Sequence, residues 1–284
     1  MKLYQIIEKL GRPEKPVLSF VGAGGKTSCI LELADDWAAR GKSVLVTTTV
    51  HMERPEILER TGWMDQSAEN IRKALETPGV VIAGSRSETL QKIRELSEEV
   101  YSQAASKAQA VLVEADGSRK FPVKVPGKNE PVIREDTTHI LILAGASALG
   151  RPLDQVCHRL EYAKKILGPE NRPLTGETLG QLLEKGYVEP LKEQYPGRKL
   201  AVILNQQDLL EEPEKMKRII EARMSVPVFL HTREEKKKRI HLILLAAGFS
   251  RRFGENKLLY PIKGKSMYLW TMERLRKIQK EGLA

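Results

Sequence analysis

Residues 21–27 read VGAGGKT and stand between an apolar run, residues 17–21, and a segment with apolar residues at helical spacing, residues 26–40. Backbone N–H groups of a glycine-rich loop, together with the N-terminus of the following helix, form a binding site for phosphate groups. In such loops a lysine reaches the terminal phosphates and a threonine hydroxyl ligates Mg²⁺. This stretch therefore predicts a strand, a phosphate-binding loop and a helix.

The spacing of the glycines differs from the longer pattern G-x-x-x-x-G-K-[ST], because Phe20 stands where that pattern has its first glycine. The shorter form, G-x-x-G-K-T, resembles the loop of Mur-type ligases. The sequence predicts that this loop binds nucleotide phosphates through six residues: Gly22, Gly24, Gly25, Lys26, Thr27 and Ser28. The alternative is a tight glycine turn that only starts a helix.

Apolar runs alternate with helical patterns along the first 230 residues. The runs are apolar throughout, as is typical of strands buried on both faces of a parallel sheet. We therefore expect an α/β fold that is P-loop NTPase-like, with a mostly parallel sheet and helices on both faces. The expected strands are residues 17–21, 43–46, 80–83, 111–113, 139–143, 200–204 and 228–230, and the expected helices are residues 3–10, 26–40, 66–76, 90–107, 175–185 and 212–223.

Two carboxylates end the apolar strand 111–113, namely Glu114 and Asp116. In P-loop proteins a carboxylate at this place helps to hold Mg²⁺ or orients the attacking water. Carboxylates that face phosphates need a metal ion to bridge the like charges. We expect Asp116 and Thr27 to hold Mg²⁺ and Glu114 to orient water or an acceptor, with Lys26, Glu114 and Asp116 as catalytic residues. A strand that merely ends in an Asp-Gly turn is the alternative.

Polar residues also end two other expected strands. Ligands bind at the carboxyl ends of strands in open α/β sheets, so Thr48 and His51 are candidates to hold a phosphate or a substrate. Asn205 and Asp208 resemble the N-K-x-D sequence that reads guanine, but Gln206 stands in place of its lysine. Base recognition by this pair is expected, and the choice between ATP and GTP stays open; ordinary strand ends and an Asn/Asp turn are the alternatives.

One arginine is a further candidate. Arg159 follows His158 in a loop before a predicted helix, and it is expected either to stabilise charge on a transferring phosphoryl group or to pair with Glu161 at the surface. The two cysteines, Cys29 and Cys157, lie in no pattern that is typical of a zinc site.

The net charge of +10 is concentrated near the C-terminus. Residues 233–284 hold 14 Lys and Arg against 5 Asp and Glu, whereas the first 232 residues hold 33 basic and 32 acidic groups. Because a nucleic-acid-binding protein carries its basic surface on the folded body, we expect no nucleic-acid partner. The sequence has no signal-peptide pattern and no apolar run near the ~18 residues of a membrane helix, so a cytoplasmic protein with no membrane partner is expected.

The C-terminal part predicts a separate unit. Residues 232–239 read TREEKKKR, which predicts a charged linker between a domain at 1–231 and a truncated β-α unit at 240–284. Residues 245–254 read LAAGFSRRFG after an apolar run, and a helix is expected at 267–278. In this second glycine-rich loop Gly248 lets the backbone approach a triphosphate, while Arg252 and Lys257 neutralise its charge.

Taken together, these stretches resemble two known families. Residues 1 to about 230 resemble the YqeC family through VGAGGKTS (21–28), VLVTTTVHM (44–52), VLVEADGSRKFPVK (111–124), the pair 130–131, residues 157–159 and the strand before Asn205 and Asp208. This resemblance implies a nucleotide-binding protein that helps to mature a selenium-dependent molybdenum hydroxylase or its cofactor. Residues 240–284 resemble the start of a MobA/MocA-like nucleotidyltransferase domain, without the later metal-binding aspartates, so transferase activity of this segment is not expected.

The resulting hypothesis is a Mg²⁺-dependent nucleoside triphosphatase that uses ATP or GTP. Its implied partners are a molybdenum hydroxylase or a selenium or molybdopterin species. Two alternatives stay open: a ligase or kinase of small metabolites, which the shortened loop suggests, and a binding module that responds to a nucleotide without hydrolysing it.

Overall fold

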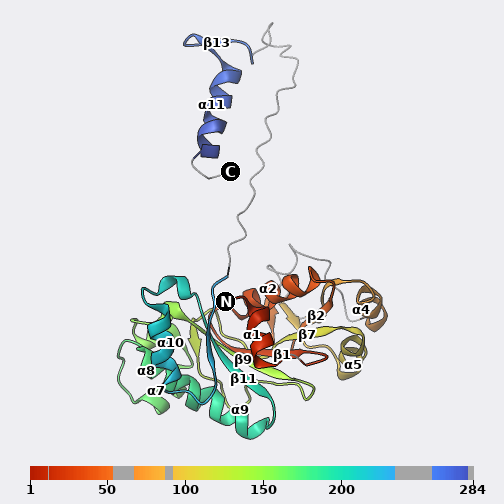
Figure 1. Ribbon diagram of the computed structural model, residues 1–284, viewed down its shortest axis with the longest axis vertical. Helices are drawn as coiled ribbons and strands as arrows, with labels where there is room; N and C mark the ends of the chain where they lie inside the picture. The colour runs from red at the N-terminus through yellow and green to blue at the C-terminus, as the bar shows by residue number, and fades with distance from the viewer. Residues whose placement is uncertain (12, 54–66, 87–91, 234–257, 281–284) are drawn as a thin grey trace. The chain divides into compact units, whose positions relative to one another are not determined.

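The computed structural model describes residues 1–11, 13–53, 67–86, 92–233 and 258–280. The chain divides into two compact units, Met1–Arg233 and Glu234–Ala284 (Figure 1). None of the helices within the described ranges combines the length and the apolar content that crossing a bilayer requires.

A seven-stranded sheet forms the centre of the first unit. Its order is β12-β11-β9-β1-β7-β2-β4, and every neighbouring pair in it is parallel. This confirms the predicted α/β class with a mostly parallel sheet. The strands are β1 (Val17–Gly22), β2 (Ser43–Thr48), β4 (Gly79–Ile82), β7 (Ala110–Glu114), β9 (His139–Gly145), β11 (Lys199–Asn205) and β12 (Val228–Leu230).

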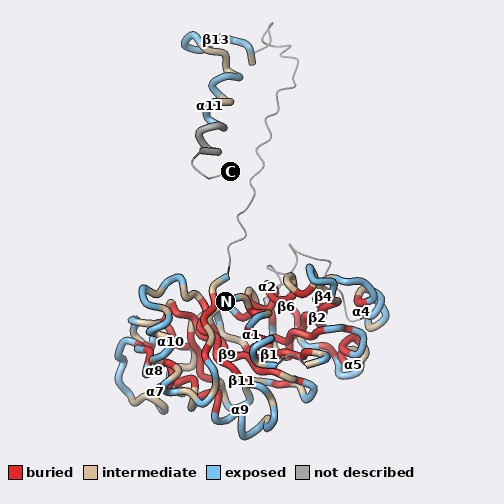
Figure 2. Tube along the Cα trace, viewed as in Figure 1, coloured by how far each residue is buried: buried red, intermediate tan, exposed pale blue. Residues whose placement is uncertain are grey.

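Both faces of the sheet are buried, as the continuous apolar runs predict. Side chains alternate between the faces of a strand, so Leu18 and Phe20 of β1 pack with helices α1 (Leu3–Leu10) and α2 (Lys26–Ala38). On the other face, Val111 packs with α4 (Ala68–Ala74) and α5 (Glu98–Lys107). The strands therefore form the most deeply buried part of the unit (Figure 2).

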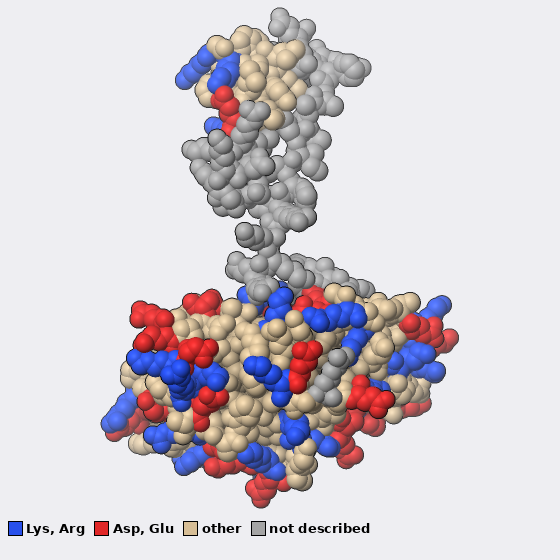
Figure 3. Space-filling view, in the orientation of Figure 1, with Lys and Arg blue, Asp and Glu red and all other residues tan. Residues whose placement is uncertain are grey.

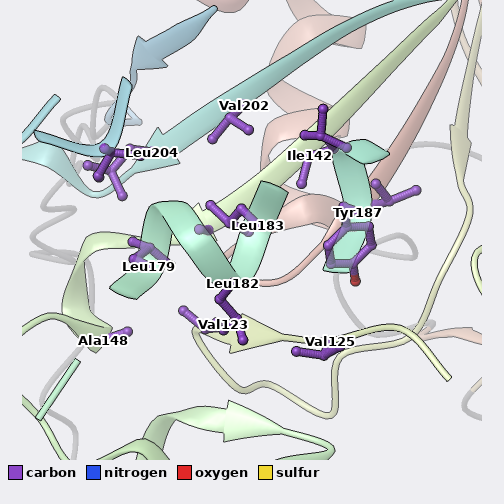
Figure 4. Close-up of a cluster of buried hydrophobic side chains, with 14 of the residues drawn as sticks. Val123, Val125, Ile142, Ala148, Leu179, Leu182, Leu183, Tyr187, Val202 and Leu204 are labelled. Carbon is purple, nitrogen blue, oxygen red and sulfur yellow. The ribbon is translucent and has the colours of Figure 1, made fainter. Parts of the chain in front are cut away.

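The second face also carries the largest apolar cluster. Helix α8 (Gly176–Leu183) continues through a π-helical turn (Glu184–Val188) into α9 (Glu189–Gln194). Figure 4 shows side chains of this helical segment against Ile142, Val202 and Leu204 of the sheet. Helices α6 (Leu153–Val156), α7 (Leu160–Leu167) and α10 (Pro213–Glu221) contribute buried residues to the same cluster.

The predicted helix at residues 90–107 is wrong in its first part. Residues 92–94 form β6 of a small antiparallel sheet with β3 (Met52–Glu53) and β5 (Ser85–Arg86), and Ile93 is fully buried there. Helix α5 begins only at Glu98, because the Ser97 hydroxyl accepts a hydrogen bond from the Val100 amide, 3.4 Å away, as an N-cap. The amphipathic pattern of residues 90–107 thus extends beyond the helix on its N-terminal side, and the pattern alone did not show where the helix begins.

The described part of the second unit holds β13 (Pro261–Ile262), β14 (Lys265–Ser266) and α11 (Met267–Lys280). The predicted helix at 267–278 is confirmed. The predicted strand at 240–245 and the candidate residues Gly248, Arg252 and Lys257 lie outside the described residues.

Charges of both signs are intermixed on the first unit. On the face seen in Figure 3, Lys and Arg side chains alternate with Asp and Glu, and neither sign covers that face. This distribution agrees with the near balance of acidic and basic groups in the first 232 residues.

Candidate functional site

The glycine-rich loop that joins strand β1 to helix α2 is very short. Strand β1 extends to Gly22 and helix α2 begins at Lys26, which leaves only residues 23–25 between them. Phe20, which replaces the first glycine of the longer pattern, is fully buried inside β1. The short spacing of the motif therefore follows from a strand that runs further toward the helix.

Backbone conformation accounts for the glycines of the loop. Gly22, Gly24 and Gly25 have φ angles of 89°, 82° and 109°, a region in which side chains with a Cβ are strained. A Cβ on Gly24 would lie 2.3 Å from the amide nitrogen of Gly145 on β9. The loop is therefore packed directly against the backbone at the carboxyl end of the neighbouring strand.

Amide groups at the start of α2 are available for an anion. The Ala23 and Gly24 amides donate to the carbonyls of Leu143 and Phe121, at 2.9 Å and 3.3 Å. The first intrahelical bond of α2 runs from the Cys29 amide to the Gly25 carbonyl. The amides of residues 26–28 precede this bond, and such amides at a helix N-terminus attract phosphate groups.

Thr27 and Glu114 meet where β7 ends beside β1. The Thr27 hydroxyl donates a hydrogen bond to Glu114 Oε2 over 2.7 Å. Glu114 is the last residue of β7 and is only 7% exposed. The sequence predicts that Thr27 and Asp116 hold Mg²⁺ together, and this stays a prediction; in the structure the side chain that Thr27 contacts is Glu114.

Asp116 lies beneath the loop and is completely buried. Its Oδ2 accepts hydrogen bonds from the Gly22 amide at 3.0 Å and from the Tyr187 hydroxyl at 2.8 Å. Lys26 Nζ lies 3.1 Å from Asp116 Oδ1 and donates to the Gly22 carbonyl at 2.7 Å. Burial and the neighbouring Asp116 raise the pKa of Tyr187 well above its ordinary value, so the phenol stays protonated as a donor.

A second lysine extends this charged group. The side chain of Lys124 is fully buried, 3.3 Å from Asp116 Oδ2 and 2.6 Å from Glu130 Oε2. Glu130 Oε1 in turn lies 3.0 Å from Arg159 Nη2. Burial raises the pKa of Glu130. The hydrogen bond and charge of Lys124, together with the charge of Arg159, lower it by more than burial raises it, so the pKa of Glu130 lies below its ordinary value. The result is an alternating chain of charges, which we call the buried relay: Lys26, Asp116, Lys124, Glu130 and Arg159.

Residues 18–161, just over half of the chain, match the model of the family described as YqeC protein. The chain belongs to the YqeC family. An uncharacterized YqeC protein of Escherichia coli is 32% identical over 167 residues, which cover 57% of this chain and 65% of that relative. Residues 242–283 match the family described as MobA-like NTP transferase domain, which associates the second unit with nucleotide chemistry. Both predicted resemblances are thereby confirmed.

The YqeC match contains the glycine-rich loop and all five residues of the buried relay. Two of the relay residues, Lys124 and Glu130, occur in stretches that carried the resemblance, but the sequence gave them no role. Tyr187 lies beyond the match and 71 residues from Asp116 in the chain, and no local pattern marked it.

Of the other candidate residues from the sequence, some contact the glycine-rich loop or the end of β7 and others do not. Asn205 Nδ2 donates to the Gly24 carbonyl at 2.8 Å, and Asn205 Oδ1 is buried with no hydrogen-bond partner among the residues that the structure describes. Thr48 donates to the Glu114 carbonyl at 2.9 Å, so it holds the strand end. Asp208 instead accepts from the Thr232 hydroxyl at the surface, and His51 is exposed.

Proposed function

We propose that the first unit binds a nucleoside triphosphate together with Mg²⁺ at the glycine-rich loop and hydrolyses it. One observation carries this proposal: where β7 ends beside β1, the Thr27 hydroxyl donates to Glu114 Oε2 over 2.7 Å. The neighbouring Lys26 contacts Asp116 and the Gly22 carbonyl of the same loop. In P-loop enzymes, a loop lysine, a hydroxyl and a strand-end carboxylate perform phosphoryl transfer through positioning and charge stabilisation.

The residues of this site fit a magnesium ion that phosphates help to hold. Within the described ranges, no group of three or more His, Cys, Asp and Glu side chains forms a cation site. Mg²⁺ is usually bound through one or two carboxylates together with substrate phosphates and water. The Thr27 hydroxyl and the Glu114 carboxylate suit this partial set of ligands. Bound Mg²⁺ would neutralise charge on the phosphates.

The proposed roles of the two carboxylates differ from those that the sequence predicts. Asp116 is enclosed by Tyr187, the Gly22 amide and two lysines, so we assign it the role of holding Lys26 in place. Glu114 is left to contact the metal and to orient the attacking water. The proposal includes both ATP and GTP.

Lys26 changes partners when a triphosphate binds. Before binding, its ammonium group contacts Asp116 and the Gly22 carbonyl. The polyphosphate offers a higher negative charge than one carboxylate, and the amides of residues 26–28 point toward it as donors. Lys26 then contacts the terminal phosphates, while the buried relay keeps Asp116 neutralised through Lys124, 3.3 Å away.

The family and the second unit supply the proposed context. The resemblance to YqeC implies a role in maturing a selenium-dependent molybdenum hydroxylase, and residues 242–283 match a MobA-like NTP transferase domain. We propose that hydrolysis drives the delivery or modification of a selenium or molybdenum species. Arg159 is paired with Glu130 and has no part in the proposed hydrolysis.

An assay of products tests this function on the full chain. With ATP or GTP, we expect release of inorganic phosphate that requires Mg²⁺ and stops when EDTA is added. A phosphorylated metabolite or an acyl phosphate in place of free phosphate would favour the ligase or kinase, which the shortened loop suggests. Saturable binding without any product would favour the binding module, and pyrophosphate from CTP would favour a nucleotidyltransferase.

A further inference from the structure

A cavity of about 490 Å³ opens beside the buried relay. It lies between the segment that follows β7 and the start of α7. Its lining residues are Gly117, Arg119, Glu130, His158, Arg159 and Glu161. Ligand pockets in proteins have volumes of ~300–1,000 Å³, so this cavity has room for a small molecule.

Two cationic side chains neutralise Glu130, one of the two carboxylates that line the cavity. Glu130 uses one oxygen for Lys124 at 2.6 Å and the other for Arg159 at 3.0 Å. The two lining arginines and two lining glutamates balance each other. Behind the wall, the fully buried Lys124 lies between Glu130 and Asp116 and is balanced by Asp116. The cavity therefore carries no net negative charge that would repel an anion.

Within the described part of the chain, the two arginines differ in how far their donors are already used. Arg119 is exposed and makes no ion pair there, whereas Arg159 lines the cavity and uses Nη2 for Glu130. The Arg159 guanidinium also lies over Gly127, where an added Cβ would approach its Cζ to 2.8 Å. Two forked donors from different segments are the usual way in which proteins bind a phosphate-type group.

Helix α7 adds a further donor surface. The amides of Tyr162 and Ala163 both donate to the Arg159 carbonyl, so the amides of residues 160 and 161 precede the first intrahelical bonds. The N-terminus of a helix carries a partial positive charge. The Glu161 carboxylate, which is exposed at the same cavity, suits a ligand that has hydroxyl or amino donors as well.

The cavity and the phosphate loop share one segment. The Phe121 ring stacks on His158, with ring centroids 6.0 Å apart, and the Phe121 carbonyl accepts from the Gly24 amide of the loop. The buried relay forms a second link, from Lys26 to Arg159. A ligand in the cavity is therefore next to the elements that bind the triphosphate.

We propose that this cavity binds a small ligand with a phosphate-type oxyanion group, held by Arg119 and Arg159. Its role as the second substrate beside the nucleotide rests on the proposed function. Binding of the oxyanion itself does not, because it requires only the cavity residues.

The pKa of His158, whose side chain lines the cavity, reports on binding of an anion. Burial, followed by the charges of Lys124, Arg159 and Arg119, lowers the pKa of His158, whereas Glu130 raises it. A bound anion favours the protonated imidazole. Titration of the full chain with inorganic phosphate, without nucleotide, is expected to raise the His158 pKa by about 0.5–1 unit relative to sodium chloride of equal ionic strength. Proton NMR follows the ring signal, which the His158→Gln variant assigns.

Variants separate the cavity from the phosphate loop. Arg119→Ala is expected to weaken the phosphate response about tenfold, whereas Arg172→Ala, at an exposed arginine that pairs with Glu170, leaves it unchanged. Lys26→Ala retains the response, because the loop lysine does not line the cavity. A His158 signal that phosphate moves no more than chloride does, an Arg119→Ala response equal to that of the wild type, or a response lost in Lys26→Ala would overturn the proposal. Loss of nucleotide binding alone would count only against the proposed hydrolysis.

Discussion

Replacement of Glu114 by glutamine is expected to lower kcat for triphosphate hydrolysis by about 10²–10³-fold. Glutamine has the same shape and still accepts the hydrogen bond from the Thr27 hydroxyl, which is 2.7 Å from the carboxylate in the wild type. It lacks the negative charge that, in the proposed function, orients water and contacts the metal. Phosphate release by the full chain, at saturating Mg²⁺ and nucleotide, measures this loss.

A matched control shows whether the loss of kcat is specific to Glu114 or follows from the loss of any carboxylate. Glu193→Gln removes one carboxylate from the exposed surface of α9, and its kcat is expected to equal that of the wild type. Circular dichroism of both variants checks that the fold is retained. A Glu114→Gln variant with unchanged kcat would show that this carboxylate takes no part in the chemistry.

Replacement of Asp116 by alanine is expected to lower the free energy of unfolding by about 3–5 kcal/mol. The carboxylate is completely buried and contacts the charged groups of Lys26 and Lys124. Its removal also leaves the Tyr187 hydroxyl and the Gly22 amide without their acceptor. The buried charges and donors that lose their partner lower the free energy of unfolding by more than the net contribution of the contacts with Asp116. Urea unfolding of the full chain, followed by circular dichroism, measures the change.

Two further variants make the stability result specific. Asp116→Asn keeps an acceptor for Tyr187 but removes the charge, and it is expected to cost about 2–3 kcal/mol. Asp154→Ala, at an exposed position on α6, is expected to cost less than about 1 kcal/mol. A loss for Asp116→Ala as small as the loss for Asp154→Ala would contradict the account of the buried relay.

The strands of the sheet were predictable because their local patterns are unambiguous. Short apolar runs such as residues 111–113 and 139–143 have few polar residues to present to solvent, so only a position inside a covered sheet suits them. The residues at the ends of these strands follow from the same logic, since parallel strands bring their carboxyl ends to one edge. Glu114 and Asn205 were expected there, and both contact the loop region.

The buried relay was not predictable, because its members are distant in sequence and unusual in burial. Lysine is rarely buried without a partner, and nothing near residue 124 indicates that this lysine is enclosed between Asp116 and Glu130. Tyr187 reaches Asp116 from a π-helical turn, which helical periodicity does not reveal. The division of roles between Glu114 and Asp116 likewise depends on which carboxylate the loop encloses.

Calorimetric titration of the full chain with Mg²⁺ and a slowly hydrolysed ATP or GTP analogue tests the central claim most directly. The account predicts saturable binding of at least one analogue to the wild type and at least tenfold weaker binding to Lys26→Ala, because the ammonium group contacts the terminal phosphates. Equal affinity of the two proteins, or no binding to the wild type, would contradict it.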